Sequence, residues 1–196
     1  MAVRRVVTIF DADSGVLRQK ARRIRRFGRD LAALAEDMVE TMRAANGVGL
    51  AAPQIGLPIR IFVAEIPKEE DDPQSGRVYI MVNPKIVKAS RTQVKGEEGC
   101  LSIPGIYGDV WRAEEVVVRA QDPYGKEFRI RAKGFLARVF QHEIDHLEGI
   151  LFIDRLEDPT ALWTYKEQDG EWVTEPVALD PIHFRALPEK AVLSVR

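Results

Sequence analysis

Apolar residues recur at helical spacing in two segments of the chain. In the first, Asp30–Asn46, apolar positions lie three and four residues apart, with Asp30 as a candidate N-cap and Gly47 as a candidate stop. The second runs from about Phe135 to Leu147, and its apolar residues fall on more than one side of the helix. A helix that is apolar nearly all round is typically buried. The pattern therefore predicts one amphipathic helix and one buried helix.

Between and after these helices the pattern is typical of short antiparallel strands. Two β-rich runs separated by the charged stretch 67–77 predict a hairpin with a mobile, exposed loop. The last two runs are divided by a turn signal at Asp122–Gly125. The predicted strands are Ile59–Ile66, Val78–Val82, Ile86–Ala89, Glu115–Ala120 and Glu127–Ala132.

Length and composition favour one domain. The chain has 196 residues, 45% hydrophobic and 30% charged, which suits a single core. We expect one catalytic domain over residues 1–196, with a core of about 18–156 and a proline-containing extension of strands and loops over 157–196. No signal peptide or membrane span is recognisable, and Cys100 is the only cysteine. These features predict a soluble, intracellular protein without an intrachain disulfide.

The net charge of −1 conceals a basic N-terminus. Residues 1–29 carry nine Lys/Arg and two Asp, a balance of +7, which leaves −8 for the remaining residues. Such a run can contact RNA phosphates, but it is more often a solvated surface, which is the interpretation favoured here.

The buried helix carries the segment His142–His146, which reads HEIDH and fits the HExxH motif. Residues four apart lie on the same helix face, so His142 and His146 can bind one metal ion. Phe135 and Val139 continue that face as an apolar wall. Glu143 is offset from it, and in this motif it takes a proton from the attacking water.

A metallohydrolase needs a third protein ligand. The longer metzincin motif is excluded because Phe152 stands where its third His belongs. A downstream Glu167 or Glu171 is one alternative and Cys100 is another, since a thiolate binds metal strongly and its glycine neighbours allow close approach. A lone cysteine can also be a small buried hydrophobe.

Three segments in order resemble the signature motifs of the peptide deformylase family. They are Gly47–Gly56 (GVGLAAPQIG), Glu98–Ser102 (EGCLS) and Gln141–His146 (QHEIDH), and the resemblance covers residues of about 18–156. It implies an α+β fold in which antiparallel sheets pack around the buried central helix that carries HExxH. It also implies the metal-dependent removal of the formyl group from N-terminal formylmethionine of nascent polypeptides, with release of formate.

Residue by residue, the resemblance implies that Cys100, His142 and His146 hold the metal and leave a fourth position for water. Gln54 would donate its side-chain amide, and Leu101 its backbone N–H, to the oxyanion formed when hydroxide attacks the formyl carbon. Glu143 would pass the water proton to the departing amine.

The resemblance also implies a substrate site. Gly47, Val48 and Gly49 would form an extended edge against which the substrate backbone pairs, although an ordinary turn is the alternative. Val48, Leu101, Val139 and His142 would surround the methionine side chain. The segment 105–109 departs from members that carry an arginine near Tyr107.

Ligand type alone does not choose the metal. The resemblance implies ferrous iron (Fe2+), with Zn2+, Ni2+ or Co2+ as substitutes, one ion per chain. Expected partners are formylmethionyl nascent peptides and, transiently, the ribosome, with no DNA and no membrane; the expected compartment is a bacterial cytoplasm, or an organelle. A zinc peptidase and a non-catalytic metal-stabilised binding module are the rival hypotheses.

Overall fold

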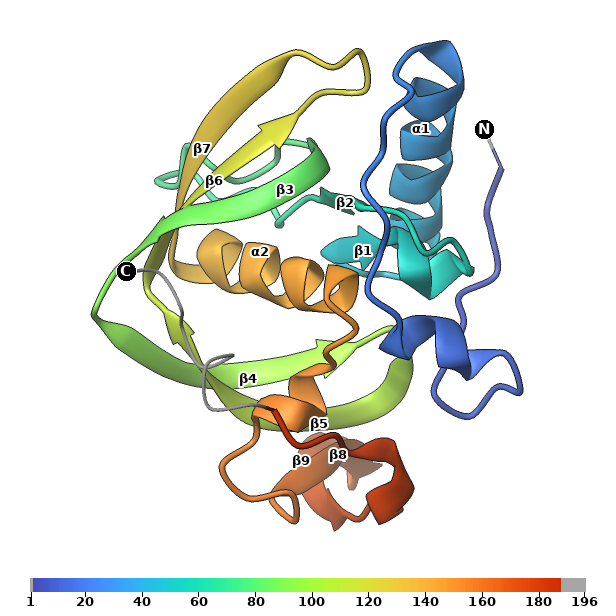
Figure 1. Cartoon of the computed structure of the whole chain (residues 1–196). Helices are drawn as coiled ribbons and strands as arrows, with labels where there is room; N and C mark the ends of the chain where they lie inside the picture. Colours follow the sequence, from blue (N-terminus) through green and yellow to red (C-terminus); the bar gives the residue numbers. More distant parts are fainter. Residues whose placement is uncertain (1, 188–196) are drawn as a thin grey trace.

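The structure is a computed structural model that describes residues 2–187, and in Figure 1 helix α2 (Gly134–Leu147) lies between two antiparallel sheets. The first sheet has the order β1-β2-β3-β6-β7 and the second the order β4-β5-β8-β9. The strands are β1 (Gly49–Ala51), β2 (Ile61–Ala64), β3 (Tyr79–Ala89), β4 (Gln93–Cys100), β5 (Ile103–Ala113), β6 (Glu115–Gln121), β7 (Glu127–Lys133), β8 (Leu162–Gln168) and β9 (Glu171–Val177). The predicted α+β fold with antiparallel sheets is confirmed.

Helix α2 is buried because apolar side chains surround it. Its Leu136, Val139 and Phe140 join the core formed with the first sheet. Phe62 packs edge-on against the Phe140 ring with centroids 5.4 Å apart. Phe135, predicted as part of the apolar wall, is 51% exposed, although it still lines the cleft described below.

The first predicted helix is observed as α1 (Arg29–Ala44), but its predicted ends are wrong. The N-cap is Gly28 and Asp30 lies inside the first turn. The left-handed residue after the helix is Asn46, with φ of 54°, in place of the predicted Gly47, because asparagine tolerates this conformation. Packing explains the glycine at position 47, because an added Cβ would lie 2.8 Å from Leu101 Cδ1.

Among the predicted strands, the hairpin of β2 and β3 and the pair β6 and β7 are confirmed. The predicted separate strand at 86–89 is wrong, since those residues are the end of β3. Asn83, with φ of 50°, and Pro84 interrupt the alternation there without ending the strand, and the register shifts between Val82 and Lys85.

The sequence did not predict β4 and β5, which pair along Gln93↔Ala113 to Gly99↔Tyr107. Strand β4 reads QVKGEEGC and lacks alternating apolar residues, so its conformation depends on this long-range pairing. The expected C-terminal strands are the hairpin β8–β9, which joins β5 through Tyr107↔Trp163.

Residues 2–187 also form the short 3-10 helices η1 (Ser14–Arg18), η2 (Ala52–Ile55), η3 (Phe152–Arg155) and η4 (Pro181–His183). Arg18 donates to Asp154 and to the His183 carbonyl, which ties the C-terminal segment to the N-terminal one. The expected domain extends to residue 196, and its residues 188–196 lie outside the described residues. Within 2–187 no helix combines the length and apolarity needed to cross a membrane.

Candidate metal centre and substrate cleft

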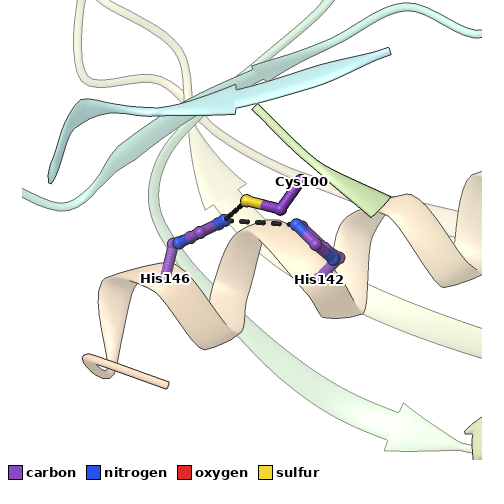
Figure 2. A group of neighbouring side chains, drawn as sticks. All are labelled: Cys100, His142 and His146. Carbon is purple, nitrogen blue, oxygen red and sulfur yellow. Dashed lines mark hydrogen bonds between the residues drawn. The ribbon is translucent and has the colours of Figure 1, made fainter. Parts of the chain in front are cut away.

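Three candidate ligands meet between β4 and α2. Cys100 ends β4, while His142 and His146 lie one turn apart on the helix (Figure 2). The Cys100 Sγ is 3.3 Å from His146 Nε2, and the two Nε2 atoms are 3.2 Å apart. Over residues 2–187, this is the group of His, Cys, Asp and Glu side chains whose donor atoms all lie within 4.8 Å of one another.

These distances suit one tetrahedral ion. Bonds of about 2.0–2.3 Å at tetrahedral angles place neighbouring ligand atoms about 3.3–3.6 Å apart. The observed separations of 3.2 and 3.3 Å are close to that spacing. One sulfur and two imidazole nitrogens form a donor set that divalent transition metals accept. The residues present therefore fit a divalent metal ion held by three protein ligands.

The alternative third ligands lie elsewhere. Glu167 is on β8 and Glu171 on β9, and both side chains are exposed. Neither belongs to the ligand group formed with the two histidines. The geometry therefore does not support a peptidase site completed by a downstream glutamate.

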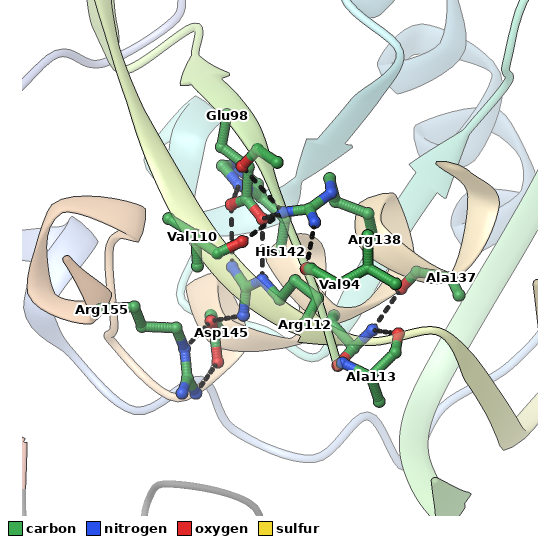
Figure 3. Close-up of polar contacts among 12 residues, drawn as sticks. Val94, Glu98, Val110, Arg112, Ala113, Ala137, Arg138, His142, Asp145 and Arg155 are labelled. Atoms are coloured by element: carbon green, nitrogen blue, oxygen red, sulfur yellow. Dashed lines mark hydrogen bonds and ion pairs between the residues drawn. The ribbon is translucent and has the colours of Figure 1, made fainter. Parts of the chain in front are cut away.

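Behind the metal centre, a buried ionic cluster orients His142 (Figure 3). The His142 Nδ1 lies 2.9 Å from Glu98 Oε2, which turns Nε2 toward Cys100 and His146. Arg112 donates to both oxygens of Glu98 at 2.8 and 2.9 Å, and to Asp145 Oδ2 at 2.5 Å. Carboxylate partners of this kind fix the orientation of metal-binding histidines.

The charges of this cluster are paired despite their burial. Burial acts to raise the pKa of Glu98, but the Arg112 guanidinium and the contact with His142 together hold it well below its usual range. Arg138 also donates to Glu98 Oε1 at 3.0 Å, and Arg155 donates to Asp145. Glu98 is therefore an anion held by several donors.

Glu143 has a different environment. It is 3% exposed, and its Oε2 has no hydrogen-bond partner among the described residues. Burial raises the pKa of this carboxyl to about 7. The carboxyl group packs directly on Gly49 of β1, where an added Cβ would lie 2.7 Å from the Glu143 Cδ. A glycine at position 49 thus leaves room for the acid.

Gln54 is aimed at the same centre from η2. Its Oε1 accepts from the Ala51 N–H at 2.8 Å, which fixes the amide. Its Nε2 then points toward Ser102 Oγ at 3.2 Å and Cys100 Sγ at 3.6 Å. Leu101 directly follows Cys100 in the chain and also lines the cleft.

A cleft of about 500 Å³ leads to this centre and brings the predicted site residues together. His146 does not line it, and it is 1% exposed. One wall is β1, an edge strand whose only strand neighbour within residues 2–187 is β2, so its other side can pair with an extended peptide. The predicted residues that line the cleft are Gly47, Val48, Gly49, Gln54, Cys100, Leu101, Val139, His142 and Glu143.

Sequence reasoning missed the cluster that supports His142. Glu98 and Cys100 are two residues apart, so a strand prediction for 93–100 would have placed both on one face. Arg112 lies outside the recognised motifs and carries no local signal. The pairing of β4 with β5 places it opposite Val94, and its side chain reaches Glu98 further along the same face of β4.

Comparisons with known proteins find similar chains among the peptide deformylases. The family model described as polypeptide deformylase matches residues 4–161. A peptide deformylase of Thermomicrobium roseum is 52% identical over 174 residues, which are 87% of this chain and 96% of that protein. One from Chloroflexus aurantiacus is 46% identical, over 89% of this chain and 99% of its own length. A crystal structure of an Ehrlichia chaffeensis peptide deformylase in complex with actinonin is 40% identical, with a TM-score of 0.74 over 81% of this chain and 91% of that one.

Proposed function

This chain belongs to the polypeptide deformylase family, and from that premise we propose that Cys100, His142 and His146 hold the metal with which it hydrolyses the formyl group of N-terminal formylmethionine. The observation that carries the assignment is the convergence of one Sγ and two Nε2 atoms within 4.8 Å. A bound divalent ion supplies Lewis-acid chemistry, which polarises the formyl group and favours ionisation of the attacking water.

Glu143 moves the proton. Its Oε2 is buried without a hydrogen-bond partner among residues 2–187, so it is free to accept a proton from the attacking water. The water oxygen bonds to the formyl carbon, and the C–N bond then breaks as Oε2 returns the proton to the departing nitrogen. Formate and a free methionine N-terminus result.

Gln54 and Leu101 stabilise the transition state. The Gln54 amide is held by Ala51 so that its Nε2 points toward the centre, where it donates to the oxyanion. The Leu101 N–H, in the residue after Cys100, is the second donor. Preorganised donors of this kind typically contribute about 2.7–4 kcal/mol each.

The substrate backbone adds to the first sheet at β1. Gly49 begins this edge strand and Gly47 and Val48 directly precede it, and all three line the cleft. The methionine side chain enters the apolar part of the cleft, beside Val48, Leu101, Val139 and His142. Residues beyond methionine then extend past Tyr107.

We assign residues 1–196 to a single catalytic domain. The extension beyond 156 contributes to the second sheet, and its Tyr165 donates to Glu97 at 2.5 Å and packs against the Tyr107 ring with centroids 5.0 Å apart. Glu97 and Tyr107 both line the cleft, so the hairpin β8–β9 supports one of its walls.

Ferrous iron is the proposed working metal, one ion per chain, with Zn2+, Ni2+ and Co2+ as substitutes that the Cys/His/His set accepts. Iron beside a thiolate is sensitive to oxygen, whereas nickel and cobalt are not. Activity lost in air and retained after replacement by nickel supports iron. Activity that is stable in air in the protein as isolated contradicts it.

The proposed setting is a bacterial cytoplasm, in keeping with the bacterial relatives. There the partners are formylmethionyl nascent peptides and, transiently, the ribosome that carries them.

Cys100→Ala tests the ligand assignment. The variant is expected to lose the metal and formate release from formyl-Met-Ala-Ser, whereas Ser102→Ala, two residues along, keeps the metal. A Cys100→Ala protein that retains about one metal per chain would exclude Cys100 as a ligand. Cleavage of unformylated peptides would favour the peptidase hypothesis.

A further inference from the structure

A second cavity lies away from the substrate cleft and shares no lining residue with it. Its volume is about 430 Å³, and it lies between the segment around residue 20, the strands β3, β6 and β7, and the C-terminal end of α2. Five cationic and two acidic side chains line it: Lys20, Arg23, Arg60, Lys85 and Arg119, with Glu127 and Glu148. The wall carries a formal charge of +3, although the whole chain carries −1.

Part of this charge is neutralised by one carboxylate. Glu148 pairs with Arg60 at 2.6 Å and with Lys20 at 2.9 Å. Arg60 also donates to the Leu147 carbonyl at the end of α2 and to the Pro84 carbonyl. Arg60 is therefore a fixed part of the wall, with its charge turned partly toward Glu148.

The remaining cations face one another without a carboxylate between them. In the sheet register Lys85 lies directly opposite Arg119, and Arg119 lies directly opposite Arg129. All three are exposed, and no ion pair is formed by any of them among residues 2–187. Glu127 is diagonal to Arg119 and is not bonded to it. Like charges directly opposite on adjacent strands destabilise a sheet.

The same sheet pairs its cations where no cavity is present. Further along β7, Arg131 and Lys133 both bind Glu115, at 2.5 and 3.0 Å. The row Lys85, Arg119 and Arg129 therefore differs from Arg131 and Lys133 in forming no ion pair among the described residues, and its Lys85 and Arg119 line the cavity.

The basic N-terminal run extends this surface. Arg22, Arg23, Arg25 and Arg26 are exposed on an extended segment that passes the cavity, and Arg23 also lines it. Exposed arginines thus continue along the chain on both sides of Arg23. Arginine in particular binds phosphate through two parallel hydrogen bonds.

We propose that the cavity and the cationic row Lys85–Arg119–Arg129 form a binding site for the phosphate backbone of RNA. The repeated phosphates match cations distributed over three strands and the N-terminal segment. A single-stranded RNA presents such repeated phosphates along an extended backbone, and the site shares no lining residue with the substrate cleft. The site would hold RNA on a surface separate from the cleft that receives the peptide.

The test measures binding of a fluorescein-labelled single-stranded RNA of about 20 nucleotides to the metal-loaded protein by anisotropy. With about three phosphates neutralised, log K should fall with log salt at a slope of about −2. Arg119→Glu is expected to weaken binding by roughly tenfold or more. Arg131→Glu, the same charge change at a paired arginine, should alter binding by less than about twofold.

The Tm of each variant shows whether weaker RNA binding comes from loss of the site or from damage to the fold. Arg119→Glu places a carboxylate opposite Lys85 and Arg129, so its Tm should rise by about 1–4 °C while RNA binding falls. Arg131→Glu should lower the Tm slightly. Formate release from formyl-Met-Ala-Ser should be unchanged in both variants, because neither residue lines the cleft.

Absence of RNA binding by the wild-type protein at low salt would overturn the proposal, as would equal losses in the two variants. Binding to anionic phosphatidylglycerol vesicles without binding to RNA would also overturn it. In each of these cases continued formate release would leave the deformylase assignment intact.

Discussion

Two buried glutamates lie near the His142–His146 pair, and the protein surrounds them in opposite ways. Glu98 accepts two hydrogen bonds from Arg112 and orients the His142 ring. Glu143 is equally buried, but its Oε2 has no hydrogen-bond partner among the described residues. The same side chain is thus a paired anion in one position and, in the role proposed for Glu143, a proton acceptor in the other, because the partners differ while the burial does not.

The largest expected effect is on stability and comes from removing Arg112, the partner of Glu98. Arg112→Met leaves Glu98 and Asp145 buried without their shared cation, and the free energy of unfolding should fall by about 3–5 kcal/mol. Urea denaturation measures it. The control is Arg131→Met on the sheet surface, expected to change stability by about 0.5 kcal/mol or less. Equal stability of the two variants would contradict the role given to Arg112.

Gln54→Ala removes the proposed hydrogen-bond donor to the oxyanion and leaves the three metal ligands in place. Turnover should fall by about 10²–10³-fold with the metal content unchanged, since the donor acts chiefly on the transition state. Steady-state kinetics with formyl-Met-Ala-Ser checks it, and Ser102→Ala, which removes the resting partner of the amide, is the control. A rise in KM alone would assign Gln54 to substrate binding.

Glu98→Gln weakens the contact that orients His142. Metal affinity should fall by about 10–100-fold, as measured by competition with a chelator. Glu97→Gln is a matched control, because Glu97 is exposed and accepts a hydrogen bond from Tyr165, whereas Glu98 contacts His142. Unchanged affinity in Glu98→Gln would mean that the ring is held by packing alone.

A smaller effect is expected from a substitution that tests whether the position of the Glu143 carboxylate matters. Gly49→Ala adds a methyl group against the Glu143 carboxylate and should displace it, lowering turnover by about tenfold at constant metal content. Gly15→Ala, where an added Cβ meets nothing within 4 Å, should leave turnover unchanged. Full activity of Gly49→Ala would show that Glu143 has room to move.

The candidate metal ligands were more predictable from the sequence than the ionic cluster that supports His142. The spacing of His142 and His146 requires only one helical turn, and Cys100 was recognised within a motif. Arg112 was not predictable, because its contact with Glu98 arises from pairing between β4 and β5, and β4 lacks the alternating pattern of a strand. The helices were predicted within a few residues because their apolar periodicity is local.

The central claim is that Glu143 transfers the proton without holding the metal. Its most direct test is metal content and formate release from formyl-Met-Ala-Ser, measured on the same anaerobic samples of the wild-type protein and Glu143→Gln. The account predicts about one metal per chain in both proteins and a loss of turnover of about 10²–10⁴-fold in the variant. Comparable turnover in Glu143→Gln, or loss of its metal, would contradict it.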